Sequence, residues 1–310
     1  MTAPLRHGTA EQLILQTPAA APRATERPLT GHSGARVVLH SNGRDSFVRK
    51  TAASASASAR LKAQADKQHS FWMFGLPFPK VRAQTVDAAG IGSFDMNYIP
   101  GRTIADAVTN SGAFDPVAVV KAVERLMWLF SAQRSGPIGA DVFKAKIAEA
   151  TGRMTRDTDD KELLEAMQTS AKRLSLQDWS AIPETPSHGD LTLENILLTT
   201  GKSIAFIDCD DGFASSFWLD FGKLFQDIDG HWCIRALYAP GAEPVRRLNA
   251  SQALEKLGLH FRHLAEEMDP RLPGRLPQLA ALGLFRAIPY AHSDLVRRFL
   301  CDRIARLLGA

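Results

Sequence analysis

Cysteine is scarce in this chain. Its 310 residues include three cysteines, Cys209, Cys233 and Cys301, which stand far apart and form no Cys-x-x-Cys pair. An odd number at these spacings excludes a disulfide framework and a cysteine-based zinc knuckle. Free thiols are usual in a reducing compartment, so we expect a cytoplasmic protein.

Long hydrophobic runs are also lacking. No apolar run approaches the roughly 20 residues that a transmembrane helix needs, and the first 28 residues mix Arg, Glu and Pro without an apolar signal core. We therefore expect no membrane partner. Residues 1–27 contain the linker-like segment Pro-Ala-Ala-Ala-Pro-Arg, which predicts a flexible N-terminal arm.

Charge of one sign is not clustered. Lys and Arg total 37 and Asp and Glu total 33, which gives a net charge of +4 without a dense Lys/Arg tract. Nucleic acid is therefore not an expected partner. A composition of 45% hydrophobic and 23% charged residues is typical of a soluble protein with one large or two modest domains. The oligomeric state stays open.

An acid, an amide five residues later and a second acid stand close together in the second half of the chain. The stretch 188–195 reads His-Gly-Asp-Leu-Thr-Leu-Glu-Asn, and the apolar run 204–207 ends at Asp208. Asp190 could accept the proton of an attacking hydroxyl, while Asn195 and Asp208 offer the hard oxygen ligands that Mg²⁺ prefers. This pattern suggests phosphoryl transfer. The alternative is a turn with local side-chain to backbone hydrogen bonds.

The spacing His188-x-Asp190-x-x-x-x-Asn195, followed by Asp208, resembles the catalytic loop and the metal-binding aspartate of the protein-kinase-like fold. Its His-Gly-Asp form is similar to the aminoglycoside phosphotransferase and choline kinase family, whose substrates are small molecules. The resemblance implies that Asp190 is the catalytic base or orients the hydroxyl, and that Asn195 and Asp208 bind Mg²⁺. His188 would belong to the catalytic loop as a brace rather than as a proton carrier. A Ser187/His188/Asp190 hydrolase triad is disfavoured, because neighbouring loop residues seldom aim at one another.

A lysine on a predicted strand precedes this loop. Asn-Gly at 42–43, flanked by β-branched and aromatic residues, is a strong hairpin signal. On the second strand, Val48 and Lys50 share one face and Arg49 takes the other. The segment 47–50 resembles the lysine strand of the kinase fold, with Lys50 binding phosphate and Val48 lying against adenine.

Two glycines precede the hairpin. Gly31 and Gly34 would let backbone N-H groups approach the phosphates of ATP, because no side chain intervenes. Ordinary turn residues are the alternative for both.

Residues 60–68 favour a helix where the fold has its regulatory helix. The family carries a glutamate there that pairs with the lysine. In this chain Gln64 is the best-aligned candidate and Asp66 is the second. Gln64 could hydrogen-bond Lys50, but it would hold the lysine less firmly than an acid would. Alternatively, both are solvated helix positions.

The segment 93–101 ends in Tyr-Ile-Pro-Gly and resembles the linker between the two lobes of these phosphotransferases. Extended backbone at Tyr98 and Ile99 could present N-H and C=O groups to the adenine edge. A plain strand, turn and helix would fit the same residues. The order of the motifs along the chain favours the linker.

Helical patterns dominate the remaining sequence. Apolar residues at three- and four-residue steps predict a helix over 119–130, and Trp128 widens its stripe, as in a helix buried on more than one side. Segments 141–153, 160–174 and most of 230–310 are also expected to be helical. The last of these would build the acceptor pocket in this fold, and its arginines favour a neutral or anionic acceptor over an aminoglycoside. The alternative is that these arginines form a solvated basic surface.

The resemblance therefore implies an α+β, protein-kinase-like fold of two lobes. A small β-rich lobe over 28–99 would bind the nucleotide, and a larger, mainly helical lobe over 100–310 would carry the catalytic loop. Asp220 matches the acid that braces this loop, and the short segment before it leaves no room for the peptide-binding segment of a protein kinase. We expect an ATP- and Mg²⁺-dependent transfer to a hydroxyl of a small molecule, such as a sugar or sugar derivative. The alternative is a nucleotide-binding pseudokinase.

Overall fold

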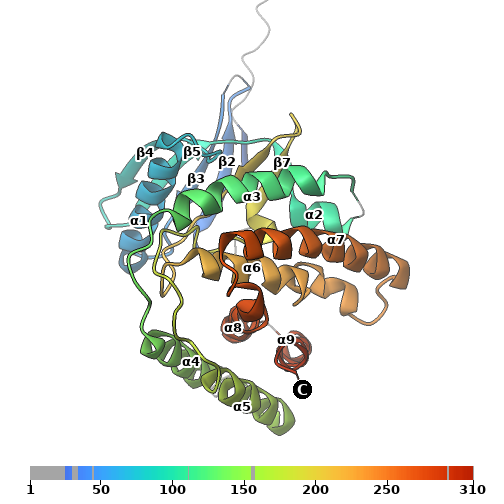
Figure 1. Ribbon diagram of the computed structural model, residues 1–310. Helices are drawn as coiled ribbons and strands as arrows, with labels where there is room; N and C mark the ends of the chain where they lie inside the picture. The colour runs from blue at the N-terminus through green and yellow to red at the C-terminus, as the bar shows by residue number, and fades with distance from the viewer. Residues whose placement is uncertain are drawn as a thin grey trace, which may run out of the picture.

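Two lobes make up the protein (Figure 1). The computed structural model describes residues 25–29, 34–43, 45–110, 112–154, 158–291 and 293–309. Within them, the small lobe is a five-stranded antiparallel sheet in the order β1-β2-β3-β5-β4, against which helix α1 packs. Its elements are β1 (Thr25–Leu29), β2 (Arg36–Ser41), β3 (Ser46–Thr51), α1 (Ala55–Met73), β4 (Val81–Val86) and β5 (Gly92–Asn97).

The large lobe is mainly helical and contains a second, three-stranded sheet in the order β6-β7-β8. Its strands and 3-10 turns are β6 (Gly101–Thr103), η1 (Leu193–Asn195), β7 (Ile196–Thr199), β8 (Ile204–Phe206), η2 (Trp232–Tyr238), η3 (Pro273–Arg275) and η4 (Ile288–Tyr290). Its α-helices are α2 (Ile104–Thr109), α3 (Pro116–Ser131), α4 (Ala140–Met154), α5 (Lys161–Ser175), α6 (Phe217–Ile228), α7 (Pro244–Met268), α8 (Leu276–Ala287) and α9 (Asp294–Leu307).

The start of the sheet corrects one predicted boundary. Strand β1 begins at Thr25 and pairs with β2 along its whole length. Residues 25–27, which we assigned to the N-terminal arm, therefore belong to the small lobe, and the rest of that arm lies outside the described residues. At the other end of the lobe, the linker expected around residue 99 falls between β5 and β6.

The predicted Asn-Gly hairpin is confirmed as β2 and β3. Gly43 has a φ of +80°, a left-handed conformation that glycine adopts without steric cost. The amide of Asn42 donates to the carbonyl of Asp45 at 3.1 Å, and the amide of Asp45 donates to Oδ1 of Asn42 at 2.7 Å. These contacts close the turn and set the pairing of β2 with β3.

The predicted helices are present as α3, α4 and α5, and Asp115 and Asp160 cap two of them by accepting hydrogen bonds from backbone amides. The prediction for Trp128 was wrong: the side chain is 50% exposed. It lies on the outer face of α3, because only the opposite face packs into the core. Helices α4 and α5 lie side by side at the edge of the large lobe and pack against α8 and α9 (Figure 1).

A cluster of rings, the aromatic junction, joins the two lobes. It consists of Phe71 and Phe78 from the small-lobe side and His188 and Phe206 from the large lobe. Ring centroids lie 5.0 Å apart for Phe71 and Phe78, 5.7 Å for Phe78 and His188, and 5.6 Å for Phe78 and Phe206. The amide of Phe206 also donates to the carbonyl of Pro77 at 2.9 Å. The segment after α1 is thus part of the large-lobe core.

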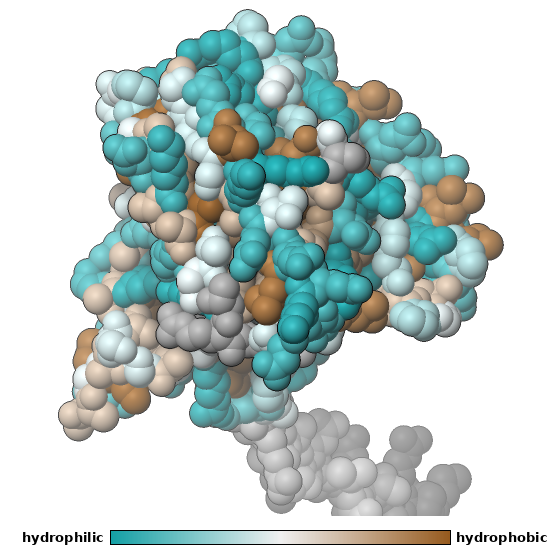
Figure 2. Space-filling model, turned by 90° about the horizontal axis from the view of Figure 1, so that it is seen from below, coloured by the Kyte–Doolittle hydropathy of each residue, from teal (hydrophilic) through white to brown (hydrophobic). Residues whose placement is uncertain are grey.

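No described helix combines the length and the hydropathy that a membrane span requires. Hydrophilic side chains predominate on the face seen from below, and hydrophobic ones are scattered among them (Figure 2). Single exposed apolar residues are ordinary on a protein surface and do not by themselves indicate a binding face.

Candidate active site

Strand alternation aims Lys50 into the space between the lobes. Val48 and Lys50 are both buried on one face of β3, whereas Arg49 is exposed on the other and pairs with Asp95. The Lys50 ammonium, whose side chain is only 2% exposed, lies 2.9 Å from Oδ1 of Asp208. This ion pair connects the small lobe to the residue predicted to bind metal.

Asp190 lies in the loop before η1, next to two partners. The Asn195 amide nitrogen donates to the backbone carbonyl of Asp190 at 2.7 Å and to its Oδ2 at 3.1 Å. The Lys223 ammonium, from α6, lies 3.1 Å from Oδ1 of Asp190. The local hydrogen bonds of a turn are therefore present. They hold the Asp190 carboxylate beside the Lys223 cation, and 40% of the Asp190 side chain remains exposed.

Burial and nearby positive charge shift the pKa of Asp190 in opposite directions. Burial raises the pKa of its carboxyl group, but the nearby Lys223 ammonium and weaker contributions that include the Arg286 guanidinium lower it, so that the pKa lies below its ordinary value. Asp190 is therefore ionised at neutral pH. A carboxylate in this state can accept a proton.

Asn195 and Asp208 come together because β7 and β8 form a hairpin. Asn195 immediately precedes β7, Asp208 follows β8, and the amide of Ile207 donates to the carbonyl of Asn195 at 3.0 Å. Asp208 has a φ of +57°, a conformation that non-glycine residues seldom adopt and that often marks a functional site.

The donor set fits Mg²⁺ bound together with a nucleotide. Among the described residues, no three or more His, Cys, Asp or Glu side chains gather as a metal site. Magnesium, however, is usually held by one or two carboxylates together with substrate phosphates. The Asn195 amide nitrogen is turned toward Asp190, which directs the amide oxygen elsewhere. That oxygen and the Asp208 carboxylate are the ligands that this chain would supply.

His188 is placed as a brace and not as a proton carrier. Its side chain is fully buried in the aromatic junction, and its Nδ1 accepts a hydrogen bond from the amide of Asp190 at 3.3 Å. Burial lowers its pKa to about 4, so the imidazole is neutral at pH 7. A buried neutral ring is suited to holding the loop, and the role of His188 as a brace stays a prediction.

Asp220 stabilises the same loop through hydrogen bonds to its backbone. Its carboxylate, at the start of α6, is fully buried and accepts hydrogen bonds from the amides of His188 at 2.6 Å and Gly189 at 2.8 Å. This contact lies where the sequence predicted a bracing acid.

Gly189 allows two loops to meet. It has a φ of +90°, and a Cβ atom there would lie 1.9 Å from the carbonyl oxygen of Asp210. The amide of Asp210 donates to the carbonyl of His188 at 2.8 Å. The loop carrying Asp190 thus lies directly against the loop that follows Asp208, and only glycine fits at the contact.

These contacts bring together the residues that were predicted to form a kinase-like catalytic centre. The family described as "Phosphotransferase enzyme family" matches residues 25–276 of this chain. The chain belongs to this family. It is accordingly a small-molecule kinase, as the form of the catalytic loop predicted.

Solved structures of phosphotransferases share the fold. A thermostable mutant of aminoglycoside phosphotransferase APH(4)-Ia in its apo form is 15% identical, with a TM-score of 0.63 over 92% of this chain and 94% of that one. A variant of it in ternary complex with ADP and hygromycin B is 18% identical, with a TM-score of 0.60 over the same shares. These likenesses confirm the protein-kinase-like fold. No curated protein matches the chain.

The partner predicted for the phosphotransferase lysine was wrong. Lys50 pairs with Asp208, whereas Nε2 of Gln64 donates to Asp210 at 2.8 Å. Arg60, from the same face of α1, also pairs with Asp210. Asp66, the second candidate, instead pairs with Lys62 on the surface. The acid that contacts α1 is therefore Asp210, which lies in the loop after Asp208.

The structure describes three of the four remaining residues that were predicted to bind the nucleotide. Gly31 lies outside the described residues, and Gly34 has a φ of +74° with open space where a Cβ would be. The amide of Tyr98 donates to the carbonyl of Ser46 at 3.4 Å, so it is used within the small lobe. Its carbonyl group and the backbone of Ile99 are left as the candidates for contacting adenine.

Sequence reasoning missed a second brace of the catalytic loop in this phosphotransferase. Asp227, two turns after Asp220 on α6, is fully buried and accepts a hydrogen bond from the amide of Leu193 at 2.7 Å. Seven-residue spacing places both acids on one helix face. That spacing was the available signal, and it points to Asp227 only once α6 is known to face the loop.

Asp227 should make stability depend on pH. Burial raises the pKa of Asp227 to about 8 and that of Asp220 to about 7, against about 3.9 in an unfolded chain. Between these values the folded protein holds protons that the unfolded chain releases, so stability falls as pH rises. His188 and His231, with pKa values lowered to about 4 by burial, oppose this fall only below pH ~6.5.

We therefore expect the free energy of unfolding to decrease from about pH 6.5 to pH 8. Asp227→Asn keeps an oxygen for the Leu193 amide but removes the titration, so the variant should lose up to about 1.4 kcal/mol per pH unit of this slope. Urea unfolding at pH 6.5, 7.2 and 8.0 measures it. An identical slope in the variant would show that Asp227 is not protonated in the folded protein.

Proposed function

We propose that this protein transfers the γ-phosphate of ATP to a hydroxyl group of a small molecule, with a sugar or sugar derivative as the acceptor. The observation that carries the proposal is the arrangement of Lys50, Asp190, Asn195 and Asp208. These residues come from both lobes and are linked by the contacts described above. A related structure holds ADP together with hygromycin B, which supports a site for a nucleotide and an acceptor.

Each residue has a distinct role in this proposal. Ionised Asp190 takes the hydroxyl proton as the bond from the acceptor oxygen to the γ-phosphorus forms and the bond from that phosphorus to the β,γ-bridging oxygen breaks. Lys50 binds nucleotide phosphate, which gives its buried ammonium a second anionic partner besides Asp208. Asn195 and Asp208 would hold Mg²⁺, which neutralises charge on the phosphates when bound.

The braces explain how the loop keeps its shape. Asp220 and Asp227 accept hydrogen bonds from backbone amides of the loop, and His188 packs into the aromatic junction. Because these contacts are buried, the position of Asp190 does not depend on a phosphorylated residue elsewhere. We therefore propose an enzyme without a phosphorylation switch.

The three cysteines are free thiols, buried or half-buried. They support the cytoplasmic location that we propose, since cytosolic thiols stay reduced.

The pseudokinase alternative has one observation in its favour: Gln64 replaces the acid that pairs with the lysine in the family. The structure weakens this argument, because Lys50 has Asp208 as its anionic partner. A pseudokinase would also have no need of an ionised, half-exposed Asp190.

Acceptor-dependent release of ADP tests the proposal. We expect purified protein with ATP and Mg²⁺ to release ADP in the presence of at least one compound from a panel of sugars, sugar derivatives, amino alcohols and nucleosides. Mass spectrometry should show the acceptor carrying one added phosphoryl group, and EDTA should abolish the reaction. Binding of ATP without acceptor-dependent ADP release from any member would favour the pseudokinase.

A further inference from the structure

One arginine near the catalytic loop takes no part in the ion pairs described there. Four acids in this region each have a cation of their own, whereas Arg286 of α8 pairs with no carboxylate among the described residues. The four pairs are Lys50–Asp208 at 2.9 Å, Lys67–Asp211 at 3.1 Å, Lys223–Asp190 at 3.1 Å and Arg60–Asp210.

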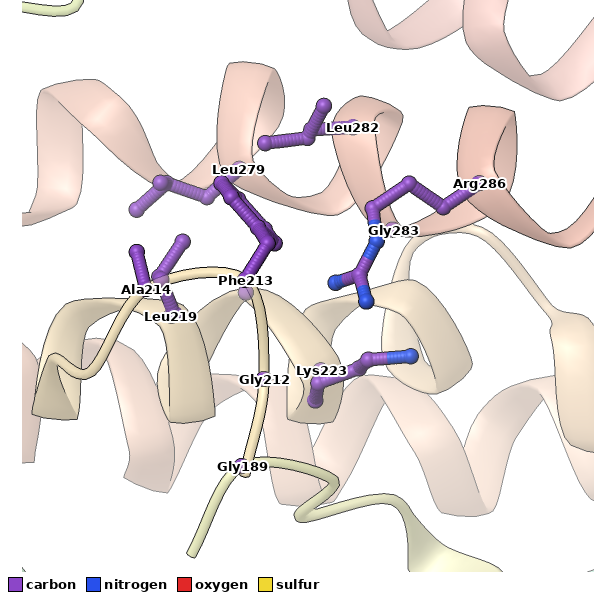
Figure 3. Close-up of a pocket in the computed structure, with 11 residues that line it drawn as sticks. Gly189, Gly212, Phe213, Ala214, Leu219, Lys223, Leu279, Leu282, Gly283 and Arg286 are labelled. Carbon is purple, nitrogen blue, oxygen red and sulfur yellow. The ribbon is translucent and has the colours of Figure 1, made fainter. Parts of the chain in front are cut away.

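Arg286 points toward the catalytic loop. Its guanidinium lies 4.7 Å from the ring centroid of Phe213 and is half-buried. It projects from α8 into a small pocket of about 10 Å³ that Lys223 and the backbone at Gly189 and Gly212 also line (Figure 3). Arg286 and Lys223 therefore bring two cations from two different helices to this pocket, and Lys223 contacts Asp190.

Close helix packing sets this position. Gly222 of α6 meets α8 so closely that a Cβ would lie 2.9 Å from Cβ of Leu279, and a Cβ at Gly283 would lie 2.5 Å from Oε1 of Gln226. Arg286 follows Gly283 by less than one helical turn. The two glycines thus let α8 approach α6 and bring the guanidinium near Lys223.

A cation in this position favours an anion. Burial lowers the pKa of Arg286, while the negative charges of Asp190 and Asp210 raise it, and the guanidinium stays charged at neutral pH. A guanidinium presents paired N-H donors that match a carboxylate or phosphate group. The other side-chain charges nearby are Lys223, which is bound to Asp190, and Glu149, which is paired with Lys146 and Arg153. A cationic acceptor would meet unfavourable charge here.

We propose that the acceptor carries an anionic group, a carboxylate or a phosphate, near its reacting hydroxyl, and that Arg286 binds this group. The proposal rests on the proposed phosphotransferase function and specifies its substrate class. Lys223 holds Asp190 in place beside that group.

Matched acceptors test the proposal by binding. Two sets share a skeleton and differ in charge: glycerol, glycerate, glycerol 3-phosphate and 3-amino-1,2-propanediol; and glucose, glucuronate, glucose 6-phosphate and glucosamine. Calorimetry in the presence of Mg²⁺ and a nonhydrolysable ATP analogue should show an anionic member of a set binding at least about tenfold more tightly than its neutral and amino counterparts. The carboxylate and phosphate members distinguish the two anions.

Variants then assign the contact to Arg286. Arg286→Gln should weaken binding of the anionic compound about tenfold or more, leave the neutral compound unchanged and leave nucleotide affinity intact. Arg286→Lys should recover part of the loss. Arg303→Gln is the matched control, because Arg303 is also half-buried and stacked on aromatic rings. It should behave like the wild type.

Binding measurements test this inference, whereas turnover measurements test the proposed function. Equal binding of all members of both sets, or an anionic preference that persists in Arg286→Gln, would overturn the inference. So would a fall in kcat of that variant with every acceptor alike, since Arg286 would then act on the transferred phosphate. Selective, Arg286-dependent binding of an anion without any phosphorylated product would support the inference and contradict the proposed function.

Discussion

Replacing Asp190 by asparagine is expected to lower kcat by about 10²- to 10⁴-fold, the usual contribution of a general base. An amide cannot take the hydroxyl proton, but it keeps an oxygen for the contacts with Lys223 and Asn195. The loop should therefore keep its shape. Steady-state kinetics with a saturating acceptor measures the loss, and calorimetry with a nonhydrolysable ATP analogue should show little change in nucleotide affinity.

The control for this variant is an acid with no contact to the loop. Asp66, on α1, pairs with Lys62 and accepts a hydrogen bond from Gln84 on the surface. Asp66→Asn should retain wild-type turnover. Undiminished turnover in Asp190→Asn would place the base elsewhere, and an equal loss of nucleotide affinity would indicate a structural role for Asp190.

Gly189→Ala should have the second large effect. The added Cβ would lie 1.9 Å from the Asp210 carbonyl oxygen, on a backbone with a φ of +90°. The clash and the strained backbone together should lower the free energy of unfolding by about 3 kcal/mol or more. Turnover should also fall steeply, because the loops carrying Asp190 and Asp208 can no longer lie against each other. Urea unfolding and kinetics on the same preparation measure both.

Gly75 separates the clash from the backbone strain. It has a similar φ of +71°, but nothing lies within 4 Å of the Cβ position. Gly75→Ala should therefore cost only the left-handed conformation, about 1–2 kcal/mol, and leave turnover intact. If the two variants lost stability equally, the close approach at Gly189 would not be the cause.

Local patterns made part of this structure predictable. The Asn-Gly turn fixed the β2–β3 hairpin, and strand alternation then placed Val48 and Lys50 on one face. The spacing from Asp190 to Asn195 and the short hairpin before Asp208 likewise depend only on residues that are close in the sequence. Such short-range geometry follows from backbone dihedral preferences, so a sequence pattern can specify it.

Contacts between distant segments were not predictable in this way. Gln64 was expected near Lys50 but donates to Asp210, which is 146 residues away. No local sequence pattern in α1 or in the loop specifies which residue Gln64 contacts. Arg286 is similar: it was one of several arginines in a helical region until the packing of α8 on α6 singled it out.

The aromatic junction has a consequence for how the chain can be divided. Phe71 and Phe78 belong to the nucleotide-binding half by sequence, yet Phe78 packs on His188 and Phe206, and Phe71 packs on Phe78 and on Phe130 of α3. A fragment cut at residue 99 would expose these two phenylalanines to water and lose the neighbours that bury them. The halves of this kinase are therefore separate in shape but interdependent in folding, and neither should survive alone as a stable protein.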